Sequence, residues 1–311
     1  MSNLFLSVGV CVYNKEKEIP NALQSLAEQT ISKDLFEIIV VDNNSTDNTE
    51  AVVKEFINNH RELNIKYFKE TNQGVSYARN RCYKEASGNY IVYFDDDEIA
   101  FKDWLQNFYD SIKKHPEAVI LAGKVIVRYE DPEFAQIADS YIDSWFANYE
   151  YGDEEIVLSK ELIEKGKIDY PIAGNMAVKM AYIKEVNGFD TDLGRSENLM
   201  LGGEETKFTK DALENGKIAI YTPRSTVHHM VIKNRCSIDF LKMKHFQQGM
   251  TFIRIYFKDA SLFKRMKIVI YHIILILGKS VQYLFSSKKE RNFISMKNCF
   301  AKGIIYQCLR K

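Results

Sequence analysis

The first hundred residues alternate between two hydrophobic periods. Residues 4–13 are a continuous apolar run typical of a buried strand, and Ile19, Leu23 and Leu26 follow at helical spacing. The pattern repeats with apolar runs at 36–41, 65–68 and 90–94, and with helical patterns from Asp47 and over 75–85. Strand–helix alternation with short connections predicts a mainly parallel sheet covered by helices on both faces.

Polar clusters follow three of these strands. Tyr13-Asn14, Asp42-Asn43-Asn44 and Asp95-Asp96-Asp97 each stand where an apolar run ends. In open α/β sheets, ligands bind beyond the carboxyl ends of the strands. We therefore expect these three sequence-distant groups to meet in one cleft.

The second part of the chain is less regular. Residues 130–170 could form a cap or an acceptor-facing region, and from Ser237 the pattern is helical to the end. We expect a catalytic domain over 1–236, with a nucleotide-binding half (1–100) and an acceptor half (101–236), and a helical basic extension over 237–311. The other expected elements are helices at 101–114, 181–186 and 204–214, and strands at 118–127, 172–178 and 218–221, the last closed by Pro223.

Four consecutive acids, Asp95 to Glu98, follow the strand at 90–94. Side chains alternate along an extended chain, so Asp95 and Asp97 should point the same way and Asp96 away from them. Four like charges are costly without a cation, and Mg²⁺ takes one or two carboxylates plus substrate phosphates. The alternative is a solvated acidic turn, or charge at the start of a helix.

Short motifs in a fixed order carry a family resemblance. The series closely resembles the family 2 glycosyltransferases of GT-A fold over roughly residues 5–250. The motifs are SVGVCVYN (7–14), VVDNNST (40–46), NQGVSYARN (72–80), FDDDE (94–98), GNM (174–176), GFD (188–190), GEETKF (203–208) and PRSTVHH (223–229). The resemblance implies an α/β fold with a Rossmann-like mixed sheet, here followed by a helical C-terminal extension.

The resemblance also assigns residues to the nucleotide-sugar donor. Asp42 matches the aspartate that contacts the base, and Tyr13 and Asn14 match residues that line the same pocket. Arg79 matches a residue near the base or the diphosphate. Read without the family, Asp42 could instead start an Asx-turn before the next helix.

The metal site is implied in the same way. Asp95 and Asp97 match the DxD pair, in which the second aspartate is the metal ligand. Asp95 and Asp96 are both counted among the donor-binding candidates: Asp95 is expected to contact the ribose or nucleotide, and the side chain of Asp96 is expected to face away. His229 matches a histidine that completes the metal or diphosphate site, whereas His228 is expected to pack. The ion is expected to be Mn²⁺ or Mg²⁺.

An acidic pair supplies the expected base. Glu204-Glu205 matches the family's Glu-Asp pair, whose second member is the catalytic base, so Glu205 is the first candidate and Glu204 the second. Glu205 is one methylene longer than the usual aspartate. The alternative is that both acids only favour a helix N-terminus.

The implied activity is inverting transfer of a hexosyl or N-acetylhexosaminyl group to a hydroxyl of a glycan or lipid-linked acceptor. A UDP-sugar is the favoured donor. Two alternatives are a sugar nucleotidyltransferase, whose GxGxR-type loop is missing at residues 13–16, and a non-catalytic scaffold for glycan assembly.

The C-terminal segment is basic. Residues 258–311 hold nine Lys and three Arg against Asp259 and Glu290, a net of +10 in a chain of zero net charge. The apolar run 268–277 falls short of the ~20 residues that span a bilayer. It is either an interfacial helix or a helix packed on the catalytic domain. Five scattered cysteines and no apparent signal peptide favour a cytoplasmic protein, peripheral at the inner membrane face in the first case. No nucleic-acid-binding module is recognisable.

Overall fold

The computed structural model describes residues 5–195 and 202–310. The chain divides into two compact units, which we describe separately. The sheet unit comprises residues 1–191 and 204–231, and the helical unit comprises residues 192–203 and 232–311.

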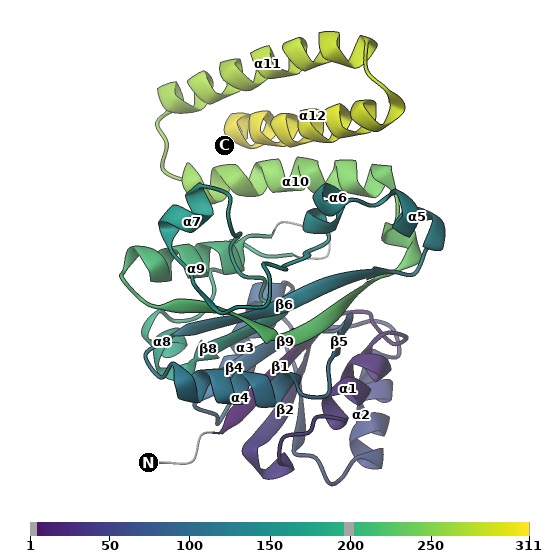
Figure 1. The fold of residues 1–311 in the computed structure, drawn as a ribbon, viewed down its shortest axis with the longest axis vertical. Helices are drawn as coiled ribbons and strands as arrows, with labels where there is room; N and C mark the ends of the chain where they lie inside the picture. Colours follow the sequence, from purple (N-terminus) through teal and green to yellow (C-terminus); the bar gives the residue numbers. More distant parts are fainter. Residues whose placement is uncertain (1–4, 196–201, 311) are drawn as a thin grey trace. The chain divides into compact units, whose positions relative to one another are not determined.

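A single mixed sheet forms the centre of the sheet unit (Figure 1). In the described residues the strand order is β3-β2-β1-β4-β8-β6-β9-β5, and β7 pairs with β9. The strands are β1 (Leu6–Val12), β2 (Phe36–Asp42), β3 (Ile65–Lys69), β4 (Tyr90–Asp95), β5 (Glu98–Ala100), β6 (Ile120–Tyr129), β7 (Ile156–Val157), β8 (Asn175–Lys179) and β9 (Ala219–Val231).

The N-terminal four strands are parallel, as the sequence predicts. β1 pairs with β2 from Leu6↔Phe36 to Val12↔Asp42 and with β4 from Leu6↔Tyr90 to Cys11↔Asp95. Every residue of β1 and β2 is buried, which explains their unbroken apolar runs. β8 then lies antiparallel between β4 and β6, so the mixed α/β fold is confirmed.

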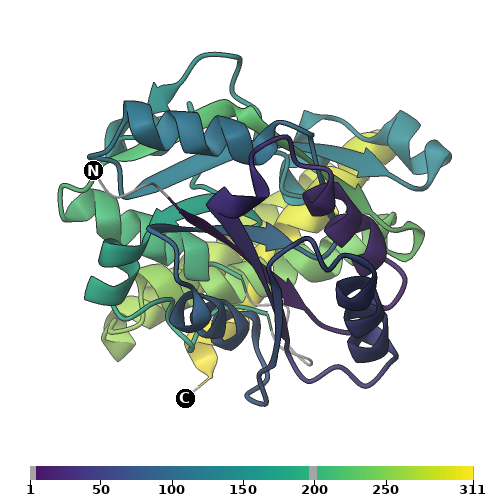
Figure 2. The same ribbon diagram turned by 90° about the horizontal axis from the view of Figure 1, so that it is seen from below.

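Helices lie on both sides of this sheet (Figure 2). α3 packs on β1 and β2, and α4 packs on β6 and β9. The helices of the sheet unit are α1 (Ile19–Ala27), α2 (Thr49–Asn59), α3 (Val75–Glu85), α4 (Trp104–Lys114), α5 (Pro132–Ile137), α6 (Ser140–Trp145), α7 (Lys160–Glu164), α8 (Met180–Glu185) and α9 (Glu204–Glu214), with a 3₁₀ turn at Lys33–Leu35.

Asn175 ties the second half of the sheet together. Its side chain accepts a hydrogen bond from Trp104 Nε1 at 2.8 Å and donates to the carbonyls of Lys124 and Ser225, each at 2.9 Å. The partners lie on α4, on β6 and within β9. One buried amide therefore fixes the strands that carry the downstream site residues.

The expected end of the strand at Pro223 is wrong. β9 continues through Pro223 to Val231, and the pairing of β6 with β9 shifts from Gly123↔Thr222 to Lys124↔Thr226. Pro223 stands in this irregularity, where its missing N–H removes no ladder bond. The continuation of β9 is what places His229 opposite Glu98 of β5.

Three long helices, with a 3₁₀ turn at Lys233–Arg235 before them, make up most of the helical unit (Figure 1). They are α10 (Ile238–Tyr256), α11 (Leu262–Leu284) and α12 (Lys288–Leu309). A small apolar core of Ile253, Val269, Ile304 and Cys308 joins them. In the described part of the chain, α11 alone is long and apolar enough to cross a membrane, judged by length and composition.

Candidate functional site

The loops after β1 and β2 are clamped together by Asn14. Its backbone N–H donates to Ser45 Oγ at 2.9 Å, and its side-chain oxygen accepts from the N–H of Thr46 at 2.8 Å. Asn14 has a φ of +51°, a left-handed conformation that asparagine tolerates better than most residues. The structure thus brings the first two predicted polar clusters into contact.

Asp42 lies at the end of β2 and is fully buried. One carboxylate oxygen accepts from the N–H of Ser45 at 2.8 Å, and the other accepts from the hydroxyl of Tyr67 at 2.7 Å. Burial and this bond to Asp42 raise the pKa of Tyr67 above its ordinary value. Sequence reasoning did not find Tyr67, which lies on β3 with nothing in its local pattern to mark it.

Arg79 joins two acids that are far apart in the sequence. Its buried guanidinium donates to Asp95 Oδ1 at 3.1 Å through Nη2 and to Glu204 through Nη1. Burial acts to lower the pKa of Arg79, but Asp95 and Glu204 outweigh it and raise that pKa above the usual value. Arg79 therefore couples the end of β4 to the start of α9.

Asp95 and Asp97 of the carboxylate run have different partners. Asp95 is the last residue of β4, whereas Asp96 and Asp97 form a turn before β5, so the alternation expected along a strand does not apply. Asp95 pairs with Arg79, and Asp97 lies beside His229, with 3.5 Å between Asp97 Oδ1 and His229 Nε2.

Asp96 does not face away from the site, so that expectation is wrong. Its Oδ2 accepts a 3.3 Å hydrogen bond from the N–H of Tyr13, because the turn rotates its carboxylate toward the β1 loop. Burial and the neighbouring Asp97 raise the pKa of Asp96 to about 8. Asp96 thereby connects the β4 turn with the β1 loop.

Lys15 is a site residue that sequence reasoning missed. Its ammonium lies 3.5 Å from Asp97 Oδ2, 4.0 Å from Asp96 Oδ1 and 3.7 Å from Glu18 Oε1. Lys15 is only 8% exposed, and its Nζ makes no hydrogen bond to the residues that the structure describes. No local sequence pattern marks Lys15, because its contacts with Asp96 and Asp97 form only when the loop after β1 meets the turn after β4.

His229 has one ring nitrogen fixed by the backbone. Its Nδ1 lies 2.6 Å from the carbonyl oxygen of Phe146, so Nδ1 carries the proton. In the neutral ring the lone pair is then on Nε2, the nitrogen that lies near Asp97. The ring of His228 instead packs edge-on against the ring of Phe101, in agreement with the packing role expected for it.

Glu98 is buried behind the turn. Its Oε2 accepts a 3.3 Å hydrogen bond from the N–H of Asp95, and burial, Asp95 and Asp97 raise its pKa well above the ordinary value. Gly174 allows this close arrangement, because a Cβ at that position would lie 2.6 Å from Glu98 Oε1 and 2.7 Å from Asp95 Oδ2. In the GNM sequence, Gly174 thus leaves room for the carboxylates of Glu98 and Asp95, and the side-chain amide of Asn175 connects α4, β6 and β9.

The acidic pair begins α9, and its two members differ. Glu204 is bound to Arg79 through its Oε1. The Oε2 atoms of both Glu204 and Glu205 are buried and have no hydrogen-bond partner among the described residues. Burial and the charge of Glu204 raise the pKa of Glu205 to about 8. Glu205 therefore has the property of a carboxylate that can take up a proton near neutral pH.

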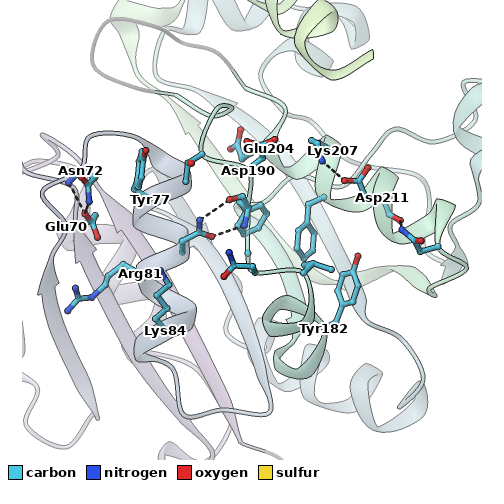
Figure 3. Close-up of a pocket in the computed structure, with 18 residues that line it drawn as sticks. Glu70, Asn72, Tyr77, Arg81, Lys84, Tyr182, Asp190, Glu204, Lys207 and Asp211 are labelled. Carbon is cyan, nitrogen blue, oxygen red and sulfur yellow. Dashed lines mark hydrogen bonds and ion pairs between the residues drawn. The ribbon is translucent and has the colours of Figure 1, made fainter. Parts of the chain in front are cut away.

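A cavity of about 770 Å³ opens between α3 and α9, and Glu204 forms part of its wall (Figure 3). Aromatic rings, amides and charged side chains line it. They include Tyr77, Asn80, Arg81, Tyr182, Lys207 and Asp211. A wall of this kind suits a polar ligand with apolar faces, such as a sugar.

Comparison with known proteins decides the family. The model for glycosyl transferase family 2 matches residues 7–186, more than half of the chain. The chain belongs to this family. It is a glycosyltransferase, and the alternative that it makes activated sugars is not supported.

Relatives of this glycosyltransferase act in glycan assembly. Succinoglycan biosynthesis protein ExoM of Rhizobium meliloti is 26% identical over 83% of this chain and 77% of its own length. Glucosyl-dolichyl phosphate glucuronosyltransferase of Haloferax volcanii is 25% identical over 78% of this chain and 75% of its own.

Solved glycosyltransferases share the fold. Mannosyltransferase PcManGT of Pyrobaculum calidifontis, in complex with GDP-Man and Mn²⁺, gives a TM-score of 0.65 at 17% identity over 99% of this chain and 88% of its own. S. aureus TarS 1–349 in complex with UDP-GlcNAc gives a TM-score of 0.56 at 22% identity, over 97% of this chain and 82% of the TarS chain. The GT-A fold expected from the sequence is thus confirmed.

Proposed function

We propose that this glycosyltransferase moves a sugar from a nucleotide-sugar donor to a hydroxyl of a glycan or lipid-linked acceptor, with inversion and with the help of a divalent metal. One observation carries the proposal. The buried Asp97 carboxylate has His229 Nε2 at 3.5 Å on one oxygen and Lys15 Nζ at 3.5 Å on the other. Such a concentration of charge at strand ends suits a cation and a diphosphate.

The residues fit a metal that the substrate helps to hold. Asp97 offers carboxylate oxygens and His229 an imidazole lone pair, both common ligands of Mn²⁺. Among the described residues no three His, Cys, Asp or Glu side chains gather to hold an ion. Mg²⁺ and similar ions commonly complete such a partial set with substrate phosphates. The metal would stabilise negative charge on the departing nucleoside diphosphate.

The donor half follows from the clamp between the first two loops. We assign Asp42 to the base, Tyr13 and Asn14 to the nucleotide pocket, and Asp95 and Asp96 to the ribose and diphosphate side. Asp42 is held in place by Tyr67 and Ser45. UDP-sugars are the favoured donors, since the structurally similar TarS is seen with UDP-GlcNAc, although PcManGT is seen with GDP-Man.

Glu205 is the proposed base. Its pKa of about 8 would let Glu205 take the proton from the acceptor hydroxyl as that oxygen attacks the anomeric carbon, while the C–O bond to the diphosphate breaks and the nucleoside diphosphate leaves. Glu204 would act by holding Arg79 against Asp95. The 770 Å³ cavity beside Glu204 is the proposed entry for the acceptor.

The proposed site of action is the cytoplasmic face of a membrane. We assign transfer to the catalytic domain, residues 1–236, and peripheral membrane contact to residues 258–311 of the helical extension. Two points support this assignment. The name of the Haloferax relative contains a dolichyl phosphate-linked sugar, and residues 258–311 carry a net charge of +10.

A thermal-shift panel tests the donor assignment. Purified full-length protein is heated with UDP-, GDP- and dTDP-sugars in Mn²⁺, Mg²⁺ or EDTA. The proposal expects one nucleotide class to raise the melting temperature, and Mn²⁺ or Mg²⁺ to enlarge that rise. An unchanged melting temperature with every donor would contradict it.

A further inference from the structure

An apolar stripe runs along the exposed side of α11. Leu262, Phe263 and Phe285 are 77%, 71% and 87% exposed, far beyond the usual exposure of such side chains. The stripe residues recur at intervals of three or four, so they share one face of the helix. They are Leu262, Phe263, Met266, Ile270, Ile273, Ile274, Leu277, Val281, Leu284 and Phe285.

The charges around the stripe have one sign. α11 contains no Asp or Glu, and Lys264, Arg265 and Lys267 lie in its first turns. The segment 258–311 has Asp259 and Glu290 as its only acids. An apolar face with basic neighbours complements an anionic lipid surface.

The opposite side of α11 belongs to the helical unit. Val269 is buried in the core with Ile304 of α12, so α11 is held along that helix. Its uncharged stretch, residues 268–278, spans about 16 Å, roughly half of a hydrocarbon core. These two facts favour a helix that lies in the plane of the membrane over one that crosses it.

A cavity of about 300 Å³ lies beside this stripe, between α10, α11 and α12. Ser280 and Tyr283 form its α11 wall and are next in sequence to Val281 and Leu284 of the stripe. Lys242 and Lys302 each contribute an ammonium group, and that of Lys242 also lies 3.0 Å from Oδ1 of the exposed Asp239. Among the described residues that line the cavity there is no carboxylate. Its remaining lining residues are Ser295, Asn298 and Cys299.

Asn298 adds a second feature of a ligand site. Its Oδ1 is buried and has no hydrogen-bond partner among the described residues. A hydroxyl on a headgroup could donate to this oxygen while a phosphate contacts the two lysines. Phosphatidylglycerol has both groups.

We infer that the α11 stripe inserts in plane into an anionic bilayer and that the Lys242–Lys302 cavity holds the phosphate of a lipid headgroup. This inference rests on the proposed action at a membrane and gives it a defined surface. The occupant is a phospholipid. A second copy of the chain on the stripe is the competing occupant.

Vesicle flotation tests the stripe. The double variant Leu277→Asp/Val281→Asp should bind phosphatidylcholine vesicles containing phosphatidylglycerol at least about tenfold more weakly than the unmodified chain. The matched control is Ile137→Asp/Val157→Asp, which changes equally exposed apolar residues of the sheet unit, 57% and 61% exposed, by the same charge. Equal binding by the two double variants would overturn the inference.

A soluble lipid tests the cavity without a bilayer. Monomeric dihexanoyl-phosphatidylglycerol should bind the unmodified chain saturably, and Lys242→Gln/Lys302→Gln should raise its Kd about tenfold or more. Lys288→Gln/Lys289→Gln removes the same charge from the same unit and should leave the Kd within about twofold of the unmodified value. Similar Kd values for both pairs would remove the headgroup site.

Two further results separate the alternatives. Alkaline carbonate should release the chain from vesicles, and retention would indicate a membrane-crossing α11 instead. Sedimentation should give the same mass for the chain and for Leu277→Asp/Val281→Asp, and dissociation of a dimer in the variant would assign the stripe to a second copy.

Donor hydrolysis without vesicles reports the catalytic unit separately, so failure of the transferase proposal would appear there and not in flotation.

Discussion

The ammonium group of Lys15 lies 3.5 Å from Asp97 Oδ2, on the opposite oxygen from His229. The ammonium thus neutralises part of the acidic turn from within the protein. A divalent ion bound to Asp97 would therefore have to share this carboxylate with the Lys15 ammonium or displace the ammonium from it.

Lys15→Met should bind Mn²⁺ more tightly than the unmodified chain, because the variant removes a competing positive charge near Asp97. Without metal it should lose about 3–5 kcal/mol of unfolding free energy, as expected for a broken buried ion pair. Differential scanning fluorimetry with and without Mn²⁺ measures both effects. Lys15→Arg keeps the charge and is the control. Equal Mn²⁺-induced shifts in Lys15→Met and the unmodified chain would show that Lys15 does not compete with metal.

Arg79→Met should destabilise the fold by about 3–5 kcal/mol, since it leaves Asp95 and Glu204 without their shared partner. Arg79→Lys keeps the charge but lacks the planar fork that reaches two carboxylates. It should therefore recover part of the stability and little of the donor hydrolysis. Urea unfolding provides the measurement. The control is Arg81→Met on the same helix, whose partly exposed side chain pairs with Glu85, and it should change stability by about 0.5 kcal/mol or less. A loss of less than about 1 kcal/mol in Arg79→Met would mean that the ion pairs of Arg79 with Asp95 and Glu204 do not stabilise the fold.

Much of the fold could be predicted because its signals are local. The helices Val75–Glu85 and Glu204–Glu214 were predicted with the observed bounds, from apolar spacing and glycine positions. The extension of β9 beyond Pro223 could not be predicted, because it depends on a pairing irregularity with β6. The short β5 was missed for the same reason, since its three residues are ordered by pairing with β9.

The site shows the same division. Asp97 and His229 could be named from motifs, and the structure brings them together at 3.5 Å. Lys15 and Tyr67 could not, because their roles come from loops and strands that meet only in the folded chain. The direction of Asp96 was predicted wrongly, because the chain turns immediately after Asp95.

Glu205→Gln should lower transfer by about 10²–10⁴-fold while donor binding persists. The unfolding free energy of the Glu205→Gln variant should instead rise above that of the unmodified chain. The unfolded Glu205 carboxyl loses its proton near its ordinary pKa of 4.5, but the folded one holds it up to about 8. Unfolding free energy in the unmodified chain therefore falls as pH rises between these values, and Gln removes that loss.

The gain in stability of Glu205→Gln should be near zero at pH 4 and largest above pH 8. The rate of transfer by the unmodified enzyme should rise with pH to a plateau above about 8, because the base acts in its deprotonated form. Chemical unfolding at several pH values and a pH–rate profile check these two expectations. A variant that is less stable at every pH would refute the assigned titration.

Gly174→Ala should disturb the acidic turn, because its Cβ would lie 2.6 Å from Glu98 Oε1. We expect a loss of about 1–3 kcal/mol and weaker donor binding. Gly278→Ala is the control, since a Cβ there meets no atom within 4 Å and alanine favours a helix. Thermal unfolding of both variants provides the comparison. If Gly174→Ala matched Gly278→Ala in stability, the close packing around Glu98 would not constrain the turn.

Release of nucleoside diphosphate from a sugar donor tests the central claim most directly. The unmodified chain, given the donor class selected by thermal shift, should release the diphosphate in Mn²⁺ or Mg²⁺ and stop in EDTA. Asp97→Asn should lose about 10²-fold or more of this activity while remaining folded. Release that is unchanged by both EDTA and Asp97→Asn, or no release with any donor, would contradict a metal-dependent donor site at Asp97.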